Sequence, residues 1–274
     1  MSSSQRHEYL WTAQSQPRAL VVLVHGFCEH AGRHAGLAQR LNAANIAVAA
    51  ADLRGHGRSP GARIWIDRFS DYLDDAEQEL AGARVRFPDC PVFLLGFSMG
   101  ALIALHLALY RRVDVRGLVL AAPGVVIDDG VAPLLRRIAP LASRFLPWLR
   151  LVKVNPKYLS RDPQVVAGFN ADPDCFHGRF PVRTGAEILA ASRLVIQDLP
   201  RLQTPLLVLH GAADRLTAPR GSQLVYQQAA STDKTLHLYP DLYHDLFHEP
   251  QSQRVYDDLL AWLAARCSPS DPRK

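Results

Sequence analysis

One serine in this chain has the surroundings of a nucleophile. Residues 96–100 read Gly-Phe-Ser-Met-Gly, with an apolar run at 92–95 before them and an apolar stretch after them. In a strand-turn-helix of this kind, the turn is too crowded for side chains at the two glycine positions. Ser98 would lie at a helix N-terminus, where free amides favour developing negative charge. The pattern predicts a nucleophile at Ser98, with an ordinary Gly/Ser helix cap as the alternative.

A serine hydroxyl is a weak nucleophile unless a base takes its proton, so a histidine and an acid must accompany it. We predict His244 as the base, because it lies in a loop directly after the apolar run 235–238. The carboxyl ends of parallel strands are where open α/β sheets build their sites. His248 is the main rival. His237 lies inside the run, where packing or a surface position explains it.

The acid that orients the histidine is predicted to be Asp214. It follows the apolar run 206–209, which again delivers it to the carboxyl edge of a sheet. Asp128 or Asp129, after the run that ends near residue 122, is the alternative acid. A surface aspartate in a turn is the structural alternative for either position.

The loop after the first apolar run, residues 25–30, reads His-Gly-Phe-Cys-Glu-His. A tetrahedral intermediate needs two donors for its oxyanion, and we predict the backbone amides of Phe27 and Met99. Metal binding is the alternative for this loop, although no pair completes a closed zinc site. The ligand-type side chains concerned are His25, Cys28, His30 and His34. We expect neither a metal nor a cofactor.

Short apolar runs that alternate with helical patterns must position these residues. The runs read as buried strands at 20–24, 47–51, 92–95, 118–121, 206–209 and 235–238. Such alternation predicts an α/β fold with a mostly parallel sheet.

Three helical patterns lie between or after these runs. Residues 69–87 carry an apolar stripe, and the opposite face holds Asp71, Asp74, Asp75, Glu77 and Glu79. Residues 101–109 are apolar nearly all round, which predicts a central buried helix. The last helix turns Val255, Leu259, Trp262 and Leu263 inward.

The alternation breaks between 126 and 198, a segment with seven prolines between 133 and 181 and no clear strand. Proline ends helices, and loops of this length are rarely structureless without a function. We therefore predict an inserted helical cap at 126–198, made of short helices, on a core formed by 1–125 and 199–274.

Composition describes an ordinary globular enzyme. Of 274 residues, 48% are hydrophobic and 21% charged, which excludes collagen, a coiled coil and bulk disorder. The four cysteines stand far apart, and the N-terminus has no apolar leader, so we expect free thiols and a cytoplasmic protein. Residues 91–110 lack charged side chains, but a buried strand and helix explain them better than a membrane span.

Charge is unevenly distributed. Residues 133–161 hold seven basic residues and no acid, so the net charge of +5 does not describe the whole surface, and no motif supports nucleic-acid binding. Residues 133–154 combine these bases with large apolar side chains. Such a segment could rest on an anionic bilayer as a peripheral contact, or its apolar face could pack on the core.

Together these segments resemble the monoacylglycerol lipase and lysophospholipase family of α/β-hydrolases, over about residues 7–266. Residues 25–33 are similar to the family's H-G-x-G-E-H-x-G-R, residues 52–59 to its D-x-R-G-H-G-x-S, and residues 97–100 to its nucleophile turn. The segments 210–214 and 243–244 match the acid and base, and 159–162 resembles part of the cap. The resemblance implies a triad of Ser98, Asp214 and His244, with oxyanion donors Phe27 and Met99.

Two positions depart from the family pattern. Cys28 stands where the family usually has glycine, and Phe97 where many animal members have histidine. Both positions border the expected pocket. We therefore expect them to affect the preference for the substrate's alcohol or head group more than the catalytic reaction. Arg54 and His56 of the second motif have no evident chemical role, and we interpret them as structural.

The expected function is that of a serine hydrolase that cleaves lipid esters, with monoacylglycerols as substrates, through an acyl-enzyme. Alternatives are a lysophospholipase, a general carboxylesterase or thioesterase, or transfer of the acyl group to another acceptor. A non-catalytic ligand receptor on the same scaffold is the alternative outside enzymes, but its usual signature is a missing triad residue.

Overall fold

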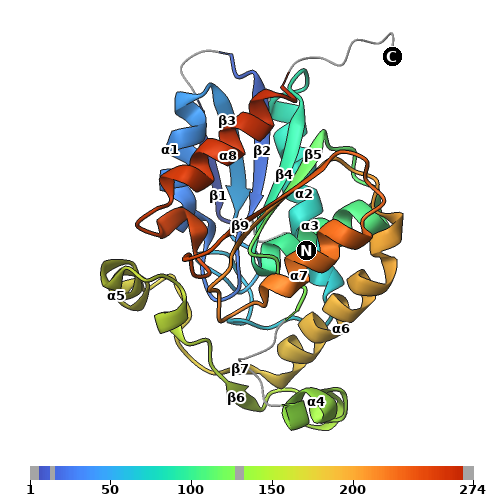
Figure 1. The fold of residues 1–274 in the computed structure, drawn as a ribbon. Coiled ribbons are helices and arrows are strands. Elements are labelled where there is room, and N and C mark those ends of the chain that lie inside the picture. Colours follow the sequence, from blue (N-terminus) through green and yellow to red (C-terminus); the bar gives the residue numbers. More distant parts are fainter. Residues whose placement is uncertain (1–5, 13–15, 127–132, 268–274) are drawn as a thin grey trace.

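The computed structural model describes residues 6–12, 16–126 and 133–267, without the side chains of 133–136, 138 and 140. In this part of the chain, one seven-stranded sheet has the spatial order β1, β3, β2, β4, β5, β8, β9 (Figure 1). Within this sheet, as described, the pair of β1 and β3 is antiparallel and the other pairs are parallel. The bounds are Glu8–Trp11 (β1), Ala19–Val24 (β2), Ile46–Ala51 (β3), Val92–Phe97 (β4), Gly117–Ala121 (β5), Leu206–Gly211 (β8) and Lys234–Tyr239 (β9).

The predicted α/β class and mostly parallel sheet are confirmed, and each predicted run is one of the parallel strands. The prediction missed β1. Its side chains alternate between exposed and half-buried positions at the sheet edge. A four-residue edge strand without a buried face has none of the continuous apolar character that marks the central strands.

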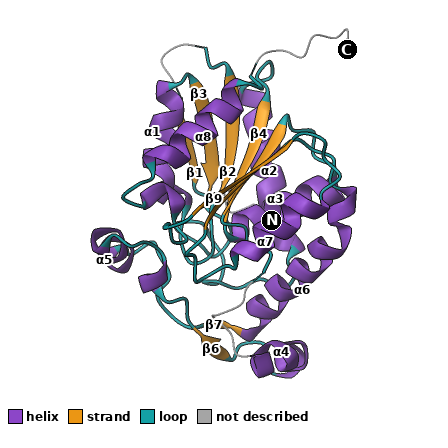
Figure 2. Ribbon diagram, viewed as in Figure 1, coloured by secondary structure: helices purple, strands orange, loops and turns teal. Residues whose placement is uncertain are grey.

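Helices cover both faces of the sheet, as Figure 2 shows. On one face α1 and α8 pack with one set of alternate strand side chains, and on the other α2, α3 and α7 pack with the other set. The bounds are Ala35–Ala43 (α1), Ser70–Arg86 (α2), Met99–His106 (α3), Pro219–Gln228 (α7) and Gln253–Ala264 (α8). Every residue of α3 is buried, and the four predicted inward residues of α8 are buried too.

Two acids of α2 do not lie on a solvated face as predicted. Asp75 and Glu79 are both buried. The Asp75 carboxylate accepts two hydrogen bonds from the Arg54 guanidinium, Nε at 2.9 Å and Nη2 at 2.7 Å. Burial raises the pKa of Glu79 to about 6. The helical period places both acids near the edge of the apolar stripe. Whether a residue at such an edge is buried depends on the loops that pack against the helix, which the helical pattern does not predict.

The segment between β5 and β8 lies beyond one end of the sheet (Figure 1). It comprises α4 (Pro133–Phe145), β6 (Arg150–Val152), α5 (Pro163–Ala171), β7 (Phe180–Pro181) and α6 (Val182–Asp198). The prediction of short helices is wrong for α6, which has 17 residues and no internal proline. The antiparallel pairing of β6 with β7 was also not predicted. In this article the described residues 133–198 are called the cap.

Two further predictions concern the cysteines and the uncharged stretch 91–110. All four cysteines are free. Among the described residues, no helix has the length and apolar character needed to cross a bilayer, and the stretch 91–110 divides mainly into β4 and α3.

Candidate active site

Ser98 lies on a strained turn between β4 and α3. Its backbone has φ +55° and ψ −113°, in a region that side-chain-bearing residues rarely adopt. The turn is held by the Ser98 amide, which donates to the Ala121 carbonyl at 2.9 Å. A Cβ atom at Gly96 would overlap the backbone of Gly100, and one at Gly100 would overlap that of Val24. The predicted crowding at both glycines is therefore present.

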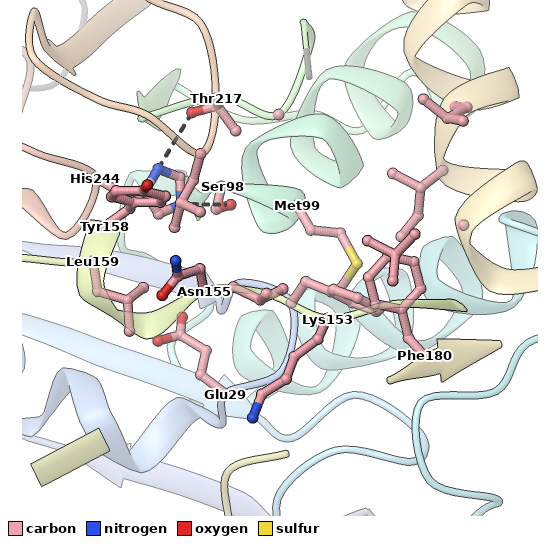
Figure 3. A pocket seen from close by; sticks show the side chains of 18 of the residues that line it. Glu29, Ser98, Met99, Lys153, Asn155, Tyr158, Leu159, Phe180, Thr217 and His244 are labelled. Carbon is pink, nitrogen blue, oxygen red and sulfur yellow. Dashed lines mark hydrogen bonds between the residues drawn. The ribbon is translucent and has the colours of Figure 1, made fainter. Parts of the chain in front are cut away.

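The structure brings Ser98, His244 and Asp214 together from three separate segments. Figure 3 shows the contact between Ser98 and His244. His244 Nε2 lies 2.9 Å from Ser98 Oγ. On the other side of the ring, Nδ1 lies 2.7 Å from Asp214 Oδ2. The loops after β4, β8 and β9 carry the three residues, and these strands end at the same edge of the sheet.

Asp214 is held as a carboxylate by a dense set of donors. The amides of Leu216 and Thr217 donate to Oδ1 at 2.7 and 3.1 Å. The Thr217 hydroxyl and His210 Nε2 contact Oδ2 at 2.8 and 3.0 Å. Burial opposes ionisation, but His244 and these hydrogen bonds outweigh it, so the pKa of Asp214 lies well below its usual value. A carboxylate with this many donors stays ionised at neutral pH.

The charge of Asp214 acts on His244. Burial of the ring lowers its affinity for a proton, but the facing carboxylate more than compensates, and the pKa of His244 is raised. Its environment therefore favours holding a proton taken from Ser98.

The rival residues lie elsewhere. His248 has Nδ1 2.7 Å from Asp245 Oδ1 and Nε2 3.1 Å from the Arg33 carbonyl, so its ring is occupied away from Ser98. His237 lies in β9 and faces Asp258 at 3.6 Å. The alternative acids Asp128 and Asp129 lie outside the described residues.

The loop after β2 is organised by a buried carboxylate. Glu29 Oε1 accepts from the Gly26 amide at 2.7 Å and contacts His34 Nε2 at 3.0 Å, and Arg33 contacts Oε2 at 3.3 Å. Burial opposes the charge, but His34 and Arg33 outweigh it, and the pKa of Glu29 lies well below its usual value. His25 Nε2 accepts from the Leu53 amide at 2.9 Å. These partners hold the backbone that leads to Phe27.

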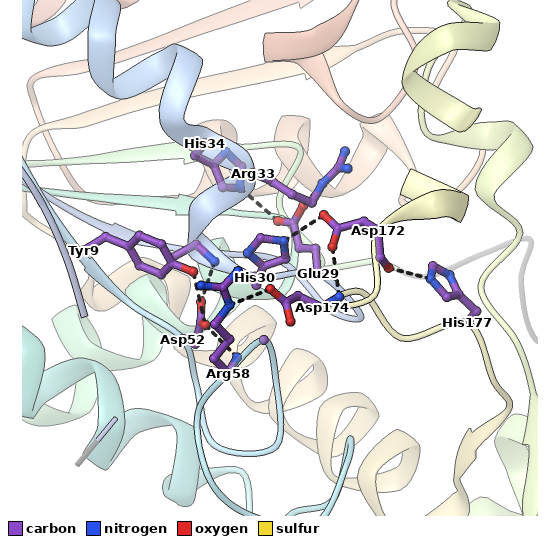
Figure 4. A network of polar contacts seen from close by, with 12 residues as sticks. Tyr9, Glu29, His30, Arg33, His34, Asp52, Arg58, Asp172, Asp174 and His177 are labelled. Atoms are coloured by element: carbon purple, nitrogen blue, oxygen red, sulfur yellow. Dashed lines mark hydrogen bonds and ion pairs between the residues drawn. The ribbon is translucent and has the colours of Figure 1, made fainter. Parts of the chain in front are cut away.

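The four ligand-type side chains of this loop do not form one cluster. His25 and His34 have the partners given above, while His30 Nε2 reaches the cap and lies 2.9 Å from Asp172 Oδ2 (Figure 4). Donor atoms of His30, Asp172 and Cys175 lie within 4.8 Å of one another. The His30–Asp172 bond explains this group as a contact between core and cap, and the Arg33 guanidinium acts electrostatically on both Asp172 and Cys175.

The two amides predicted as oxyanion donors belong to pocket-lining residues. Phe27 and Met99 line the same cavity as Ser98. In the described part of the chain, neither amide has a hydrogen-bond acceptor. Both donors are therefore free to bind an oxygen of a substrate.

The second motif has structural contacts that agree with its interpretation. Asp52 accepts from the amides of Ala31 and Arg58 at 2.8 and 2.9 Å, which ties the loop after β3 to the loop after β2. Arg54 binds the buried Asp75 of α2. Burial lowers the pKa of His56 to about 3, so its ring is neutral beneath Phe27.

A cavity of about 370 Å³ opens over Ser98 and extends between the core and the cap. Most of its lining is apolar, with contributions from Phe27, Phe97, Met99, Leu151, Phe180 and Ile188. Polar side chains are fewer, and they include Asn155, Tyr158 and Thr217. The Thr217 hydroxyl lies 3.3 Å from His244 Nδ1 (Figure 3). This combination of an apolar pocket and a few polar groups is typical of sites for small apolar ligands.

Cys28 does not face this cavity. It is 1% exposed and packs with Ile64, Leu159, Phe169 and Cys175. Burial raises the pKa of its thiol well above the usual value. The thiol is therefore buried beside the site and does not open into the cavity.

Two partners of Asp214 were missed from the sequence. Thr217 lies three residues after Asp214, in the same segment. At this short spacing, its hydroxyl could have been considered as a hydrogen-bond donor to the Asp214 carboxylate. In the sequence analysis, His210 served only to locate the segment that contains Asp214, and no contact with Asp214 was predicted for it. Nothing in the local pattern says that a strand histidine turns toward an aspartate four residues later.

Comparison with known proteins agrees with this geometry. Residues 15–251 match the family described as "Serine aminopeptidase, S33". The chain is 37% identical over 256 residues to a monoacylglycerol lipase of Mycolicibacterium smegmatis, covering 93% of this chain and 91% of that one. It is 34% identical over 266 residues to a monoglyceride lipase of Rattus norvegicus, covering 96% and 88%.

A solved structure is similar as well. The monoacylglycerol lipase of Paleococcus ferrophilus superposes with a TM-score of 0.85 at 28% identity, over 96% of this chain and 99% of that chain. The α/β-hydrolase fold is thereby confirmed. The chain belongs to this family of serine hydrolases, beside the monoacylglycerol lipases, and is a serine ester hydrolase.

Proposed function

We propose that the protein hydrolyses monoacylglycerols to fatty acid and glycerol, with Ser98 as nucleophile, His244 as base and Asp214 as the orienting acid. One observation carries the proposal: the hydrogen-bonded series from Ser98 Oγ through His244 to Asp214 opens into a largely apolar cavity. An ester at Ser98 can therefore leave its acyl chain in an apolar environment.

The first half of the reaction forms an acyl-enzyme. His244 Nε2 takes the proton of Ser98 Oγ as this oxygen attacks the ester carbonyl. The carbonyl oxygen becomes negative and is bound by the amides of Phe27 and Met99. When the intermediate collapses, His244 gives its proton to the glycerol oxygen, and the carbon–oxygen bond to glycerol breaks.

The second half regenerates the enzyme. His244 removes a proton from a water molecule, which attacks the acyl carbon and forms a second tetrahedral intermediate. The bond to Ser98 Oγ breaks, Ser98 regains the proton from His244, and the fatty acid leaves. The chain's own side chains and amides supply each group that these steps need.

Ester substrates fit the cavity better than peptides do, although the family description names an aminopeptidase. An aminopeptidase must bind a charged α-amino group, which calls for an acid left free in the pocket. Glu29 is the one acid of the lining among the described residues, and Gly26, His34 and Arg33 occupy its oxygens. The names of the relatives, monoacylglycerol and monoglyceride lipases, support the lipid substrate.

A lysophospholipase activity is the second candidate, and one observation favours it. Lys153 and Arg215 both line the cavity, and both are exposed rather than buried. Such basic side chains could form ion pairs with a phosphate on the alcohol part of the substrate.

We further propose that residues 126–198 act as a cap domain on a core formed by 1–125 and 199–274, and that the cap contacts membranes. Six large apolar side chains between residues 141 and 151 of the cap are more than a third exposed: Leu141, Phe145, Leu146, Trp148, Leu149 and Leu151. Trp148 stacks on Trp65 of the core and Leu151 lines the cavity, but these contacts leave much of the apolar surface exposed. Arg137, Arg144 and Arg150 are exposed beside them. An apolar surface with basic neighbours suits the interface of an anionic bilayer, so the proposed location is cytoplasmic and membrane-peripheral.

The test is an assay of the purified enzyme against a panel of esters. Monoacylglycerols, lysophospholipids, p-nitrophenyl esters and amino-acid p-nitroanilides are compared by kcat/KM, beside fluorophosphonate labelling of Ser98. The proposal expects monoacylglycerols to be the best substrates and Ser98 to be the labelled residue. Higher kcat/KM for lysophospholipids or for the anilides, or labelling at another residue, would overturn it.

A further inference from the structure

A second histidine, His210, contacts the same carboxylate oxygen of Asp214 as His244 does. It lies in β8 and is completely buried. Its Nε2 is 3.0 Å from Asp214 Oδ2, the same oxygen that faces His244 Nδ1 at 2.7 Å. Its Nδ1 is 2.6 Å from Ser222 Oγ, on α7. Ser222 is also completely buried.

The chemistry of these contacts determines which atoms donate. An ionised carboxylate only accepts hydrogen bonds, so His210 Nε2 must carry a hydrogen and donate it to Asp214. In the neutral ring Nδ1 is then an acceptor, and the Ser222 hydroxyl donates to it. Ser222 therefore stabilises the one neutral tautomer of His210 that can serve Asp214.

We propose that His210 and Ser222 are positioning residues that extend the Ser98–His244–Asp214 series by two members. The inference rests on the proposed function. His210 restrains Asp214 Oδ2 in line with His244 Nδ1, and Ser222 keeps the donor tautomer of His210 in place. Neither residue lines the cavity, so neither is expected to touch substrate.

The electrostatic consequence follows from the groups around the pair. His244 is faced by Asp214, Asp245 and Glu29, and Asp214 by His244 and His210. A hydrogen bond from His210 spreads part of the Asp214 charge away from His244. Without this donor, Asp214 would attract the proton of His244 more strongly, and its carboxylate would also be less restrained.

The experiment compares His210→Met, which removes the donor, with His210→Gln, whose amide can still donate toward Asp214. The matched control is His106→Met, because His106 is another buried histidine outside the cavity lining. Among the described residues its ring has one hydrogen-bond partner, the Ala191 carbonyl at 3.1 Å. Activity on a soluble short-chain ester is expressed per active site, counted by fluorophosphonate labelling.

The proposal expects His210→Met to lower kcat roughly 10- to 100-fold, as for loss of a hydrogen bond to a charged group, with little change in KM. The acid limb of the kcat/KM profile should move to higher pH. His210→Gln should recover most of the rate, and His106→Met should leave the profile in place. A purely structural role would reduce the number of active sites without moving the limb.

Ser222→Ala provides a second test if His210→Met fails to fold. It should lower kcat roughly fivefold, the effect of one neutral hydrogen bond. Ser231→Ala is its control, since Ser231 is buried and bonds only to the Asp233 carbonyl among the described residues. Wild-type kcat and pH profile in both His210→Met and Ser222→Ala, with Ser98→Ala inactive, would overturn this inference alone. Activity in Ser98→Ala would instead overturn the proposed function.

Discussion

The carboxyl edge of the sheet and the cap use their side chains in opposite ways. At the sheet edge, Asp214 and Glu29 are buried, and each oxygen has at least one donor. In the cap, large apolar residues such as Phe145 and Trp148 are 69% and 61% exposed. At the sheet edge, hydrogen bonds fix the positions of the charged side chains. In the cap, apolar side chains remain exposed to solvent.

The difference separates two tasks that an esterase of lipids must perform. Bond breaking needs groups held within narrow limits of distance and charge. Substrate capture from a bilayer needs apolar surface that water can reach before the lipid does. Polar and ring contacts join the two regions, among them His30 with Asp172 and the stacked rings of Trp65 and Trp148, whose centroids are 3.4 Å apart. The comparison predicts that changes at the sheet edge affect every substrate, while changes in the cap affect only membrane-held ones.

The largest expected effect is that of removing the proposed nucleophile or the proposed base. Ser98→Ala and His244→Ala should each reduce kcat about 10⁴-fold or more with the fold intact, because these residues act as a unit. The loss should be equal for a soluble short-chain ester and for monoacylglycerol in vesicles. Steady-state assays on both substrates, with circular dichroism for the fold, provide the measurement. A loss confined to vesicles would break the comparison.

Asp214→Asn should cost about 10³- to 10⁴-fold in kcat, because the base loses its orienting charge. It should also change the pH dependence. The base must be neutral to act, and the Asp214 carboxylate raises the pKa of His244, so in the wild type the acid limb lies higher than for an isolated histidine. Without the carboxylate this limb should move to lower pH. Near-full activity of Asp214→Asn, with loss in Asp128→Asn or Asp129→Asn, would refute this assignment.

The cap should respond to charge reversal on membranes only. Arg137→Glu with Arg144→Glu should weaken binding to anionic vesicles by roughly 2 to 4 kcal/mol at low salt, since each base near such a surface contributes about 1 kcal/mol. Activity on vesicle-held monoacylglycerol should fall with it, and activity on the soluble ester should not. Arg193→Glu with Arg201→Glu is the control, because these exposed bases lie near the C-terminal end of the cap and just after it, away from residues 137–150 in the sequence. Co-sedimentation measures binding, and equal binding by both double variants would remove the membrane role.

The smallest effect is expected at Cys28. Because the thiol is buried and its pKa is raised, a bulky maleimide should label it far more slowly than Cys90 or Cys267, which are partly exposed. Cys28→Ala should leave kcat within a few-fold of the wild type. Mass spectrometry of the labelled protein, followed with time, makes the comparison. Rapid labelling of Cys28 that substrate slows would place the thiol at the site after all.

Much of the site could be predicted because its signals are local. A nucleophile turn needs glycines at fixed offsets from the serine, and a base or an acid after a buried strand reaches the same sheet edge. Ser98, Asp214 and His244 each stand in such a context, and the structure brings all three together. The parallel strands were equally legible, because strands buried on both faces leave continuous apolar runs.

The rest depended on contacts between segments distant in the chain. Periodicity placed Asp75 on a helix, but its burial follows from Arg54 in another loop. The sequence does not say whether the Cys28 thiol faces the pocket; its burial follows from residues of the core loop 62–67 and of the cap that pack around it. His210 reads as an ordinary strand residue, and only the packing of α7 on β8 brings Ser222 to its ring. The amino-acid pattern determined which groups could react and along which strands they lie. Burial, tautomer and exposure were decided by tertiary structure, because each depends on which atoms replace water around a side chain.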